Sequence, residues 1–297
     1  MSLPAPPPPI CWIELDVPVR PAEEEPVAAA LAACGSVGAW TVRPRLVRAY
    51  FEGDAEEVEA RFRVAWRAST GTRWRGPLSA RRTPDRDWLR RWRSSVGPVR
   101  VTPTLWVAPP GDAGPRPAGE RVVVIQPGQG FGTGSHPTTQ ALLRWIEADP
   151  GRRVLDVGCG SGVLGIAALL LGARRAVGLD VDADALANAA ENRHRNAVAD
   201  RLSLVHGTLD AIAARPVFDR VVANLDRTAL AGFAGPLVVR CAPGGRLGVA
   251  GLLAGERDGF LASLASLPVE VAEERTDEDT VGGDVWWSAW LARREGP

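Results

Sequence analysis

VLDVGCGSG, residues 154–162, joins an apolar strand pattern to three alternate glycines. The residues that follow, 163–171, are apolar enough to form a buried helix. In a doubly wound sheet such a turn lies at the carboxyl ends of the strands, where ligands bind, and the helix behind it offers unpaired N–H groups. A tight strand-to-helix connection without a ligand would show the same glycines, so this turn alone does not decide function.

Strand and helix patterns alternate onward from this turn. That rhythm predicts an α/β fold with a doubly wound, mostly parallel sheet and helices on both faces. The tail at residues 269–291, broken at Gly282 and Gly283, predicts a closing hairpin. The other expected elements are strands at residues 122–125, 154–157, 176–180, 202–206, 217–223 and 246–250 and a helix at residues 183–195.

Two positions distinguish between classes of nucleotide cofactor. The dinucleotide fingerprint has a third glycine where this chain has Val163, which disfavours a nicotinamide enzyme. Asp180 ends the next strand, 22 residues after Gly158, where a carboxylate can accept hydrogen bonds from both hydroxyls of a ribose. An adenosine cofactor therefore suits this turn. Asp182, on the loop beyond, is expected to cap the next helix.

Two further segments carry polar groups. QPGQGFGTGSHPTT, residues 126–139, holds many glycines and hydroxyls, which are costly to order unless they are used. A hinge between domains and a lid over a ligand explain this segment equally well. Asn224 lies in the run 221–225, at the end of an apolar strand pattern. It could orient a nucleophile or a cofactor, although a strand-end Asn is also a common turn residue.

The front of the chain predicts a separate small domain. Residues 11–17 alternate apolar and polar side chains, as a half-buried strand does. A helix is expected at residues 21–33, strands at 39–42 and 47–52, and a second helix at 55–66. This order suggests a split β-α-β, ferredoxin-like α+β domain, whose small sheet leaves a face or an edge for a partner.

Residues 79–120 change character and predict a linker. Trp88 and Trp92 lie in an arginine-rich stretch that is followed by clusters of proline and glycine. Four residues apart, the two tryptophans would share a helix face and pack. The arginines could face ribosomal RNA or an acidic protein, but a solvated helix face is the better explanation. The expected organisation is a tail at residues 1–10, the α+β domain at 11–78, the linker at 79–120 and the doubly wound domain at 121–297.

Composition limits the class of protein. The 297 residues carry a formal net charge of zero, so a polyanion partner would need a local basic patch. Four widely spaced cysteines without a C-x-x-C pair fit a reduced, cytoplasmic setting. No apolar run approaches the roughly 18 residues of a membrane span. Three histidines without cysteine partners at ligand spacing predict no metal site.

Together these motifs resemble the PrmA methyltransferases, which modify the large-subunit ribosomal protein at the base of the factor-binding stalk. The resemblance covers nearly the whole chain and is most specific in FGTGSHPTT, residues 131–139. Residues 87–98 also look like the segment that joins the family's two domains. The further matches are DVGCGSG at residues 156–162, GLDVD at 178–182 and ANL at 223–225.

The resemblance implies a class I methyltransferase fold and an S-adenosylmethionine-dependent enzyme that N-methylates lysine and N-terminal amines of that ribosomal protein. The front domain would recognise the substrate. Thr139, Gly158, Asp180 and Asn224 match the family's cofactor contacts, and Asn224 is also the expected catalytic residue. The expected cofactor-binding residues are Phe131, Thr133, Thr139, Asp156, Gly158, Gly160, Asp180 and Asn224.

Three alternatives remain open. Residues 226–228, DRT, stand where the family commonly has small apolar residues, which leaves room for a same-fold methyltransferase that acts on lysines of another protein or on a small molecule. A dinucleotide oxidoreductase is disfavoured by Val163. A binding module without catalysis is disfavoured by the intact glycines, Asp180 and Asn224. The expected protein is a monomer whose partner is the ribosomal protein, with no membrane and no nucleic acid beyond a contact with ribosomal RNA.

Overall fold

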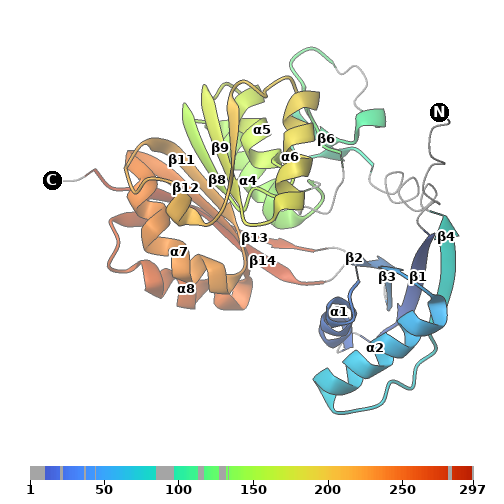
Figure 1. Ribbon diagram of the computed structural model, residues 1–297. Helices are drawn as coiled ribbons and strands as arrows, with labels where there is room; N and C mark the ends of the chain where they lie inside the picture. Colours follow the sequence, from blue (N-terminus) through green and yellow to red (C-terminus); the bar gives the residue numbers. More distant parts are fainter. Residues whose placement is uncertain are drawn as a thin grey trace. The chain divides into compact units, whose positions relative to one another are not determined.

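The chain divides into two compact units, Met1–Ser95 and Val96–Pro297 (Figure 1). Each unit contains its own cluster of buried hydrophobic side chains. The computed structural model describes residues 11–20, 23–36, 38–43, 45–84, 97–112, 117–126, 132, 134–279 and 283–295.

The first unit is an antiparallel sheet with two helices packed on one face. Its elements are β1 (Cys11–Pro18), α1 (Glu24–Ala33), β2 (Gly38–Arg43), β3 (Leu46–Glu52), α2 (Ala55–Thr70) and β4 (Ser79–Pro84). The strand order is β2-β3-β1-β4. This confirms the predicted split β-α-β arrangement, and β4 completes it.

Alternation along β1 builds the core of this unit. Ile13 and Leu15 are fully buried and pack with Phe62 of α2 in one hydrophobic cluster. The helix is bounded by residues suited to its two ends. Asp54 accepts a hydrogen bond from the N–H of Glu56 at 3.0 Å, and Gly71 ends the helix with φ +70°.

β4 corrects the predicted linker at residues 79–120. This strand pairs with β1 along its whole length, so the first unit extends at least to Pro84. Arg81 is one of the arginines that the sequence placed on a solvated helix face. In the sheet, however, it lies on the face opposite the helices and forms ion pairs with Glu14 and Asp16. Trp88 and Trp92 lie outside the described residues.

The second unit contains a large sheet and a small sheet. Its strands are β5 (Val99–Arg100), β6 (Leu105–Ala108), β7 (Arg121–Val124), β8 (Arg153–Val157), β9 (Arg175–Asp180), β10 (Leu202–His206), β11 (Phe218–Asn224), β12 (Cys241–Leu253), β13 (Val269–Glu278) and β14 (Val285–Arg293). The small sheet has the order β5-β6-β7, so β5 and β6, predicted as linker, belong to this unit.

The large sheet confirms the predicted doubly wound architecture. Its strand order is β10-β9-β8-β11-β12-β14-β13. The first five strands in this order are parallel, and β14 runs antiparallel between β12 and β13 as the predicted closing hairpin. Because the parallel strands point the same way, their carboxyl ends meet at one edge of the sheet.

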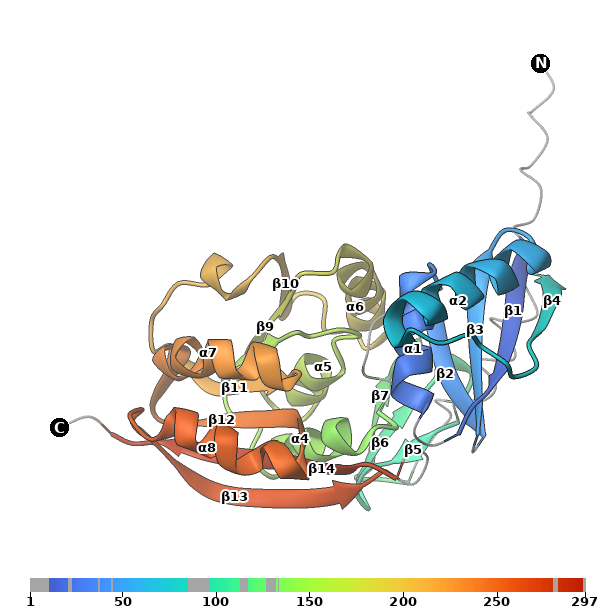
Figure 2. The same ribbon diagram turned by 90° about the horizontal axis from the view of Figure 1, so that it is seen from below.

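Helices cover both faces of the large sheet (Figures 1 and 2). They are α4 (Pro137–Ala148), α5 (Val163–Leu170), α6 (Ala183–Arg195), α7 (Arg227–Arg240) and α8 (Arg257–Leu264), with short 3-10 turns η2 (Pro110–Asp112), η3 (Leu209–Ala211) and η4 (Ala254–Glu256). Within the described ranges, no helix has the length and apolar character needed to cross a membrane.

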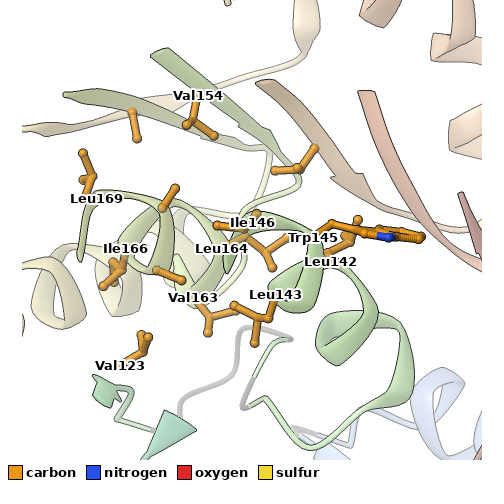
Figure 3. Packing of buried hydrophobic residues seen from close by; sticks show 14 of the residues in the cluster. Val123, Leu142, Leu143, Trp145, Ile146, Val154, Val163, Leu164, Ile166 and Leu169 are labelled. Carbon is orange, nitrogen blue, oxygen red and sulfur yellow. The ribbon is translucent and has the colours of Figure 1, made fainter. Parts of the chain in front are cut away.

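Alternate residues of β8 point into two different cores. Val154 joins the cluster formed with α4 and α5, whereas Leu155 joins the cluster formed with α7 and α8. Figure 3 shows the first of these clusters, with Ile146 of α4 beside Leu164 of α5. The buried helices on this face hold the loop after β8 in a fixed position relative to the start of α4.

Candidate functional site

The carboxyl ends of β8, β9 and β11 lie side by side. Val157 of β8 pairs in register with Leu179 of β9 and Ala223 of β11. The N–H groups of Gly158 and Cys159 both donate to the carbonyl oxygen of Leu179, at 2.8 and 3.0 Å. The glycine turn is therefore fixed to the end of the neighbouring strand.

Three glycines give this turn its shape. Gly158, Gly160 and Gly162 have φ values of +69°, +52° and +80°, which side-chain-bearing residues rarely adopt. A Cβ atom on Gly158 would also lie 2.4 Å from Cδ2 of Leu225, which follows β11. The alternate glycines found in the sequence are thus required by backbone conformation and, at Gly158, by close packing.

Asp180 lies half-buried at the end of β9 and faces the turn. Its Oδ2 accepts the N–H of Gly160 at 2.8 Å, and its Oδ1 accepts the N–H of Asp182 at 3.0 Å. Each carboxylate oxygen has a second lone pair for a further donor. Asp182 caps α6 by accepting the N–H of Asp184 at 2.8 Å, which confirms its predicted role.

Asp156 is buried beneath the same turn, with 1% of its surface exposed. Its Oδ2 accepts the N–H of Gly165, in the first turn of α5, at 3.0 Å. Its Oδ1 has no hydrogen-bond donor among the described residues. Burial raises the pKa of Asp156 to about 7, the hydrogen bond from Gly165 opposes this rise, and the negative charge of Asp180 adds to it.

The start of α4 approaches the end of β11. His136 caps this helix by accepting the N–H of Thr138 at 3.3 Å, and Pro137 occupies its first turn. Thr139 is buried, and its Oγ1 accepts a hydrogen bond from Nδ2 of Asn224 at 3.2 Å. The amide of Asn224 is thereby oriented, and its Oδ1 remains available as an acceptor.

Sequence reasoning missed three asparagines, two on α6 and one at its C-cap. Asn196 accepts the N–H of Val124 in β7 at 2.8 Å and donates to its carbonyl oxygen at 2.6 Å. Asn192, fully buried, accepts the N–H of Gln126 at 2.8 Å, and Asn188 donates to the carbonyl oxygen of Gln126 at 3.1 Å. The asparagines thus hold the backbone that leads into residues 127–131.

The same asparagine network reaches the glycine turn. Nδ2 of Asn192 donates to the carbonyl oxygen of Ser161 at 3.0 Å. The hydroxyl of Ser161 in turn donates to the carbonyl oxygen of Gly132 at 2.7 Å. Asn192 and Ser161 therefore connect both flanks of residues 127–131 to the turn after β8. The spacing of four residues between the asparagines was the available sequence signal.

Six of the predicted site residues lie along the carboxyl edge of the large sheet. They are Thr139, Asp156, Gly158, Gly160, Asp180 and Asn224. Phe131 and Thr133 lie outside the described residues. Asp226, the first residue of the unusual DRT sequence, caps α7 by accepting the N–H of Ala229 at 3.0 Å. This departure from the family pattern therefore has a structural explanation at a helix start.

Known proteins match the chain over both of its units. The family model described as "Ribosomal protein L11 methyltransferase (PrmA)" matches residues 11–281. A protein named ribosomal protein L11 methyltransferase in Sorangium cellulosum is 39% identical over 204 residues, which cover 66% of this chain and 64% of that protein. A relative of the same name in Chromohalobacter salexigens is 40% identical over 208 residues, which cover 69% and 68%.

The match thus spans about two thirds of the length of these curated relatives. A solved structure described as ribosomal protein L11 methylase, from Lactobacillus delbrueckii subsp. bulgaricus, resembles this chain with a TM-score of 0.59. The two are 24% identical, and the similarity covers 67% of this chain and 100% of the other. This likeness shows that the fold is shared.

Proposed function

The chain belongs to the family of ribosomal protein L11 methyltransferases (PrmA), and on that premise we propose that it is an S-adenosylmethionine-dependent enzyme that methylates amine nitrogens of ribosomal protein L11. The family match across both units carries the proposal. The site geometry supports it, because a glycine turn, a strand-end carboxylate and an oriented amide share one edge of the sheet.

The residues present fit this cofactor. Each oxygen of Asp180 accepts one backbone N–H, at 2.8 and 3.0 Å, and can accept one ribose hydroxyl as well. Gly160 has no side chain, so its backbone can approach a ligand closely, while Gly158 packs against Leu225 and fixes the turn. Asp156 holds the first turn of α5 behind it. Phe131 and Thr133 complete the proposed set of contacts, with Thr139 and Asn224.

The protein's main task is to position the substrate amine. When bound, S-adenosylmethionine supplies an activated methyl group on a positively charged sulfur. Alignment for an in-line displacement can supply about 7 kcal/mol or more of the barrier reduction, and no covalent enzyme intermediate is needed. Oδ1 of Asn224 accepts one N–H of the amine, while Thr139 keeps the Asn224 amide in place at 3.2 Å.

The amine must also lose its proton to solvent before it can react. A free lysine has a pKa of about 10.4 and is almost entirely protonated at neutral pH. Burial disfavours the ammonium form, and a nearby positive charge disfavours it further. Oδ1 of Asn224 can accept one N–H of the amine once it is neutral, and so orient the nitrogen lone pair toward the methyl group.

We propose the first unit as the recognition domain for the protein substrate. We also propose that the enzyme acts in the cytoplasm. The helices of the first unit pack on one face of its sheet, and the other face carries a polar cluster in which buried Glu14 of β1 accepts hydrogen bonds from Tyr50 of β3 and Arg81 of β4. A monomeric enzyme with a separate recognition unit accounts for methylation of a protein substrate.

Intact-mass spectrometry of unmethylated L11, incubated with the enzyme and S-adenosylmethionine, tests the proposal. The expected result is a series of mass gains of one methylene each, formed more slowly by Asp180→Ala at a limiting cofactor concentration. Since the chain contains no lysine, its own side chains do not compete as lysine substrates. No mass gain, with cofactor binding shown by calorimetry, would move the substrate to another protein or a small molecule. Absence of cofactor binding would refute the enzyme itself.

A further inference from the structure

A basic groove lies at the amino ends of the parallel strands, at the edge of the sheet opposite the candidate site. Arg152 and Arg153 introduce β8, Arg174 and Arg175 introduce β9, and Arg201 precedes β10. The groove has a volume of about 600 Å³. Every residue that lines it is charged: Arg152, Arg153, Arg174, Arg175, Asp200, Arg201 and Asp219.

The register of the sheet places these arginines next to one another. Arg153 pairs directly with Arg175, and the N–H of Arg174 donates to the carbonyl oxygen of Arg152 at 2.8 Å. Like charges on directly neighbouring strands destabilise a sheet. The arrangement therefore works against folding stability unless negative charge is brought in.

The chain's own carboxylates do not neutralise the groove. The guanidinium groups of Arg152, Arg153 and Arg174 have no hydrogen-bond or ion-pair partner among the described residues. Arg175 and Arg201 donate only to carbonyl oxygens.

Neither of the two lining carboxylates forms an ion pair with these arginines among the described residues. Asp219 Oδ2 accepts backbone N–H groups of Arg152 and Arg153, at 3.2 and 2.8 Å, and Asp200 makes no ion pair with the arginines within the described residues. Five guanidinium groups thus face two carboxylates, which leaves the groove with an excess of three positive charges.

We propose that this groove binds the phosphodiester backbone of a nucleic acid. Guanidinium groups match phosphate oxygens in charge and in bidentate geometry. The arginines extend over three neighbouring strands, about 10 Å at the usual spacing, which is more than a single phosphate group occupies. The groove therefore suits a row of phosphates.

The lining also distinguishes a nucleic acid from an acidic protein. Protein interfaces have an apolar and aromatic centre, whereas interfaces with nucleic acids are more polar and far more positive. None of the lining residues is apolar or aromatic, so the groove offers neither a protein hot spot nor a surface on which bases could stack. A groove that contacts only the phosphate backbone binds nucleic acids without sequence preference.

The groove is separate from the candidate site. β8 runs from Arg153 to Val157, so about 16 Å of strand lies between the groove and the glycine turn. Binding at one edge consequently leaves the other edge accessible. The inference does not depend on the proposed methyltransferase activity, and its test needs no turnover.

Fluorescence anisotropy of a labelled 20-base-pair RNA duplex, titrated with the full chain at several salt concentrations, tests the inference. The groove variant is Arg152→Gln/Arg153→Gln/Arg174→Gln. The matched control, Arg67→Gln/Arg73→Gln/Arg121→Gln, removes the same charge from exposed positions elsewhere. The groove variant should bind at least tenfold more weakly, and its plot of log affinity against log salt should be shallower by about 2 to 3, at roughly 0.7 to 0.9 per lost phosphate contact.

Each outcome decides a separate point. Equal weakening by the control variant shows that overall charge, and not the groove, binds the duplex, and overturns the proposal. The proposal is also overturned if inorganic phosphate binds as tightly as RNA, or if an acidic peptide binds selectively. A DNA duplex of the same length identifies the source of the backbone: equal affinity indicates either nucleic acid, and weaker binding indicates RNA. Thermal unfolding of both variants controls for loss of fold.

Discussion

At the scale of single residues, the protonation of Asp156 links stability to pH. A free aspartate has a pKa of about 3.9, whereas burial raises that of Asp156 to about 7. Between these values the folded chain retains a proton that the unfolded chain has released, so stability falls as the pH rises. Asp156→Asn is neutral at every pH. Between pH 5 and pH 8 the wild type should therefore lose about 2 to 3 kcal/mol of its free energy of unfolding relative to Asp156→Asn.

Urea unfolding followed by circular dichroism, at closely spaced pH values, measures this difference. Asp182→Asn is the control for the substitution itself, because it makes the same change of carboxylate to amide at an exposed position. A pH-independent offset for Asp156→Asn would show that Asp156 is ionised throughout the range.

Asp180 should act on the cofactor more than on the fold. Its replacement by Ala removes a charged acceptor for the ribose hydroxyls, and affinity for S-adenosylhomocysteine should fall roughly tenfold to hundredfold, or about 1.5 to 3 kcal/mol. Isothermal titration calorimetry gives the affinity. Asp182→Asn, two residues further along, should leave it unchanged because Asp182 caps α6. Equal losses of affinity in both variants would show that the substitutions act by disturbing the fold of the loop and not by removing a contact with the cofactor.

Site residues at strand ends could be predicted from chain order, and the buried asparagines of α6 could not. Asp180 follows an apolar strand and precedes a helix, so its position at the carboxyl edge was determined by chain order alone. Asn192 lies in a helix whose polar residues are normally solvated. Its burial depends on contacts such as that with Gln126, which follows β7 and lies 66 residues away in the sequence, and no local pattern encodes that contact.

At the scale of elements, α6 connects β7 with the glycine turn. Asn192→Ala would leave the N–H of Gln126 and the carbonyl oxygen of Ser161 without these partners. Asn196→Ala would do the same to the N–H and carbonyl oxygen of Val124. Each variant should lower the free energy of unfolding by about 1 to 3 kcal/mol. Only Asn192→Ala should also weaken binding of S-adenosylhomocysteine, since only Asn192 contacts the turn.

Chemical denaturation and calorimetry on the two variants separate a positioning role from a structural one. If both variants lose affinity in proportion to their loss of stability, α6 acts on the site through general folding. If Asn192→Ala alone loses affinity, the network positions the turn. Asn192→Gln, with the same amide on a longer side chain, shows whether the group itself or its exact reach is required.

Helices and strands could be predicted where the hydrophobic periodicity and the order of elements along the chain indicate the same structure. β8, β9 and β11 are apolar strands bounded by turn residues, and each was expected within one residue of its observed bounds. α4 was missed because residues 126–139 were treated as one loop, although Pro137 and the cap at His136 are ordinary helix-start signals. β4 was missed because its arginines find carboxylate partners only after β1 has paired with it.

At the scale of the whole molecule, we propose that recognition and chemistry belong to different units. Ile13, Phe62 and the rest of the first core belong to residues 13–80, and both large-sheet cores draw on residues from 99 onward. Every contact described at the candidate site also lies within the second unit. The second unit is therefore expected to fold and to bind cofactor without the first.

Removal of residues 1–95 tests this division. The shortened chain should keep its affinity for S-adenosylhomocysteine, since Asp180, Thr139 and Asn224 retain their partners. Its KM for L11 should rise by at least about tenfold, equivalent to ~1.4 kcal/mol of lost substrate binding. Calorimetry and initial rates of methyl transfer measure the two quantities on one preparation. An unchanged KM would remove the recognition role from the first unit, whereas loss of cofactor affinity would show that the second unit needs the first in order to form its site.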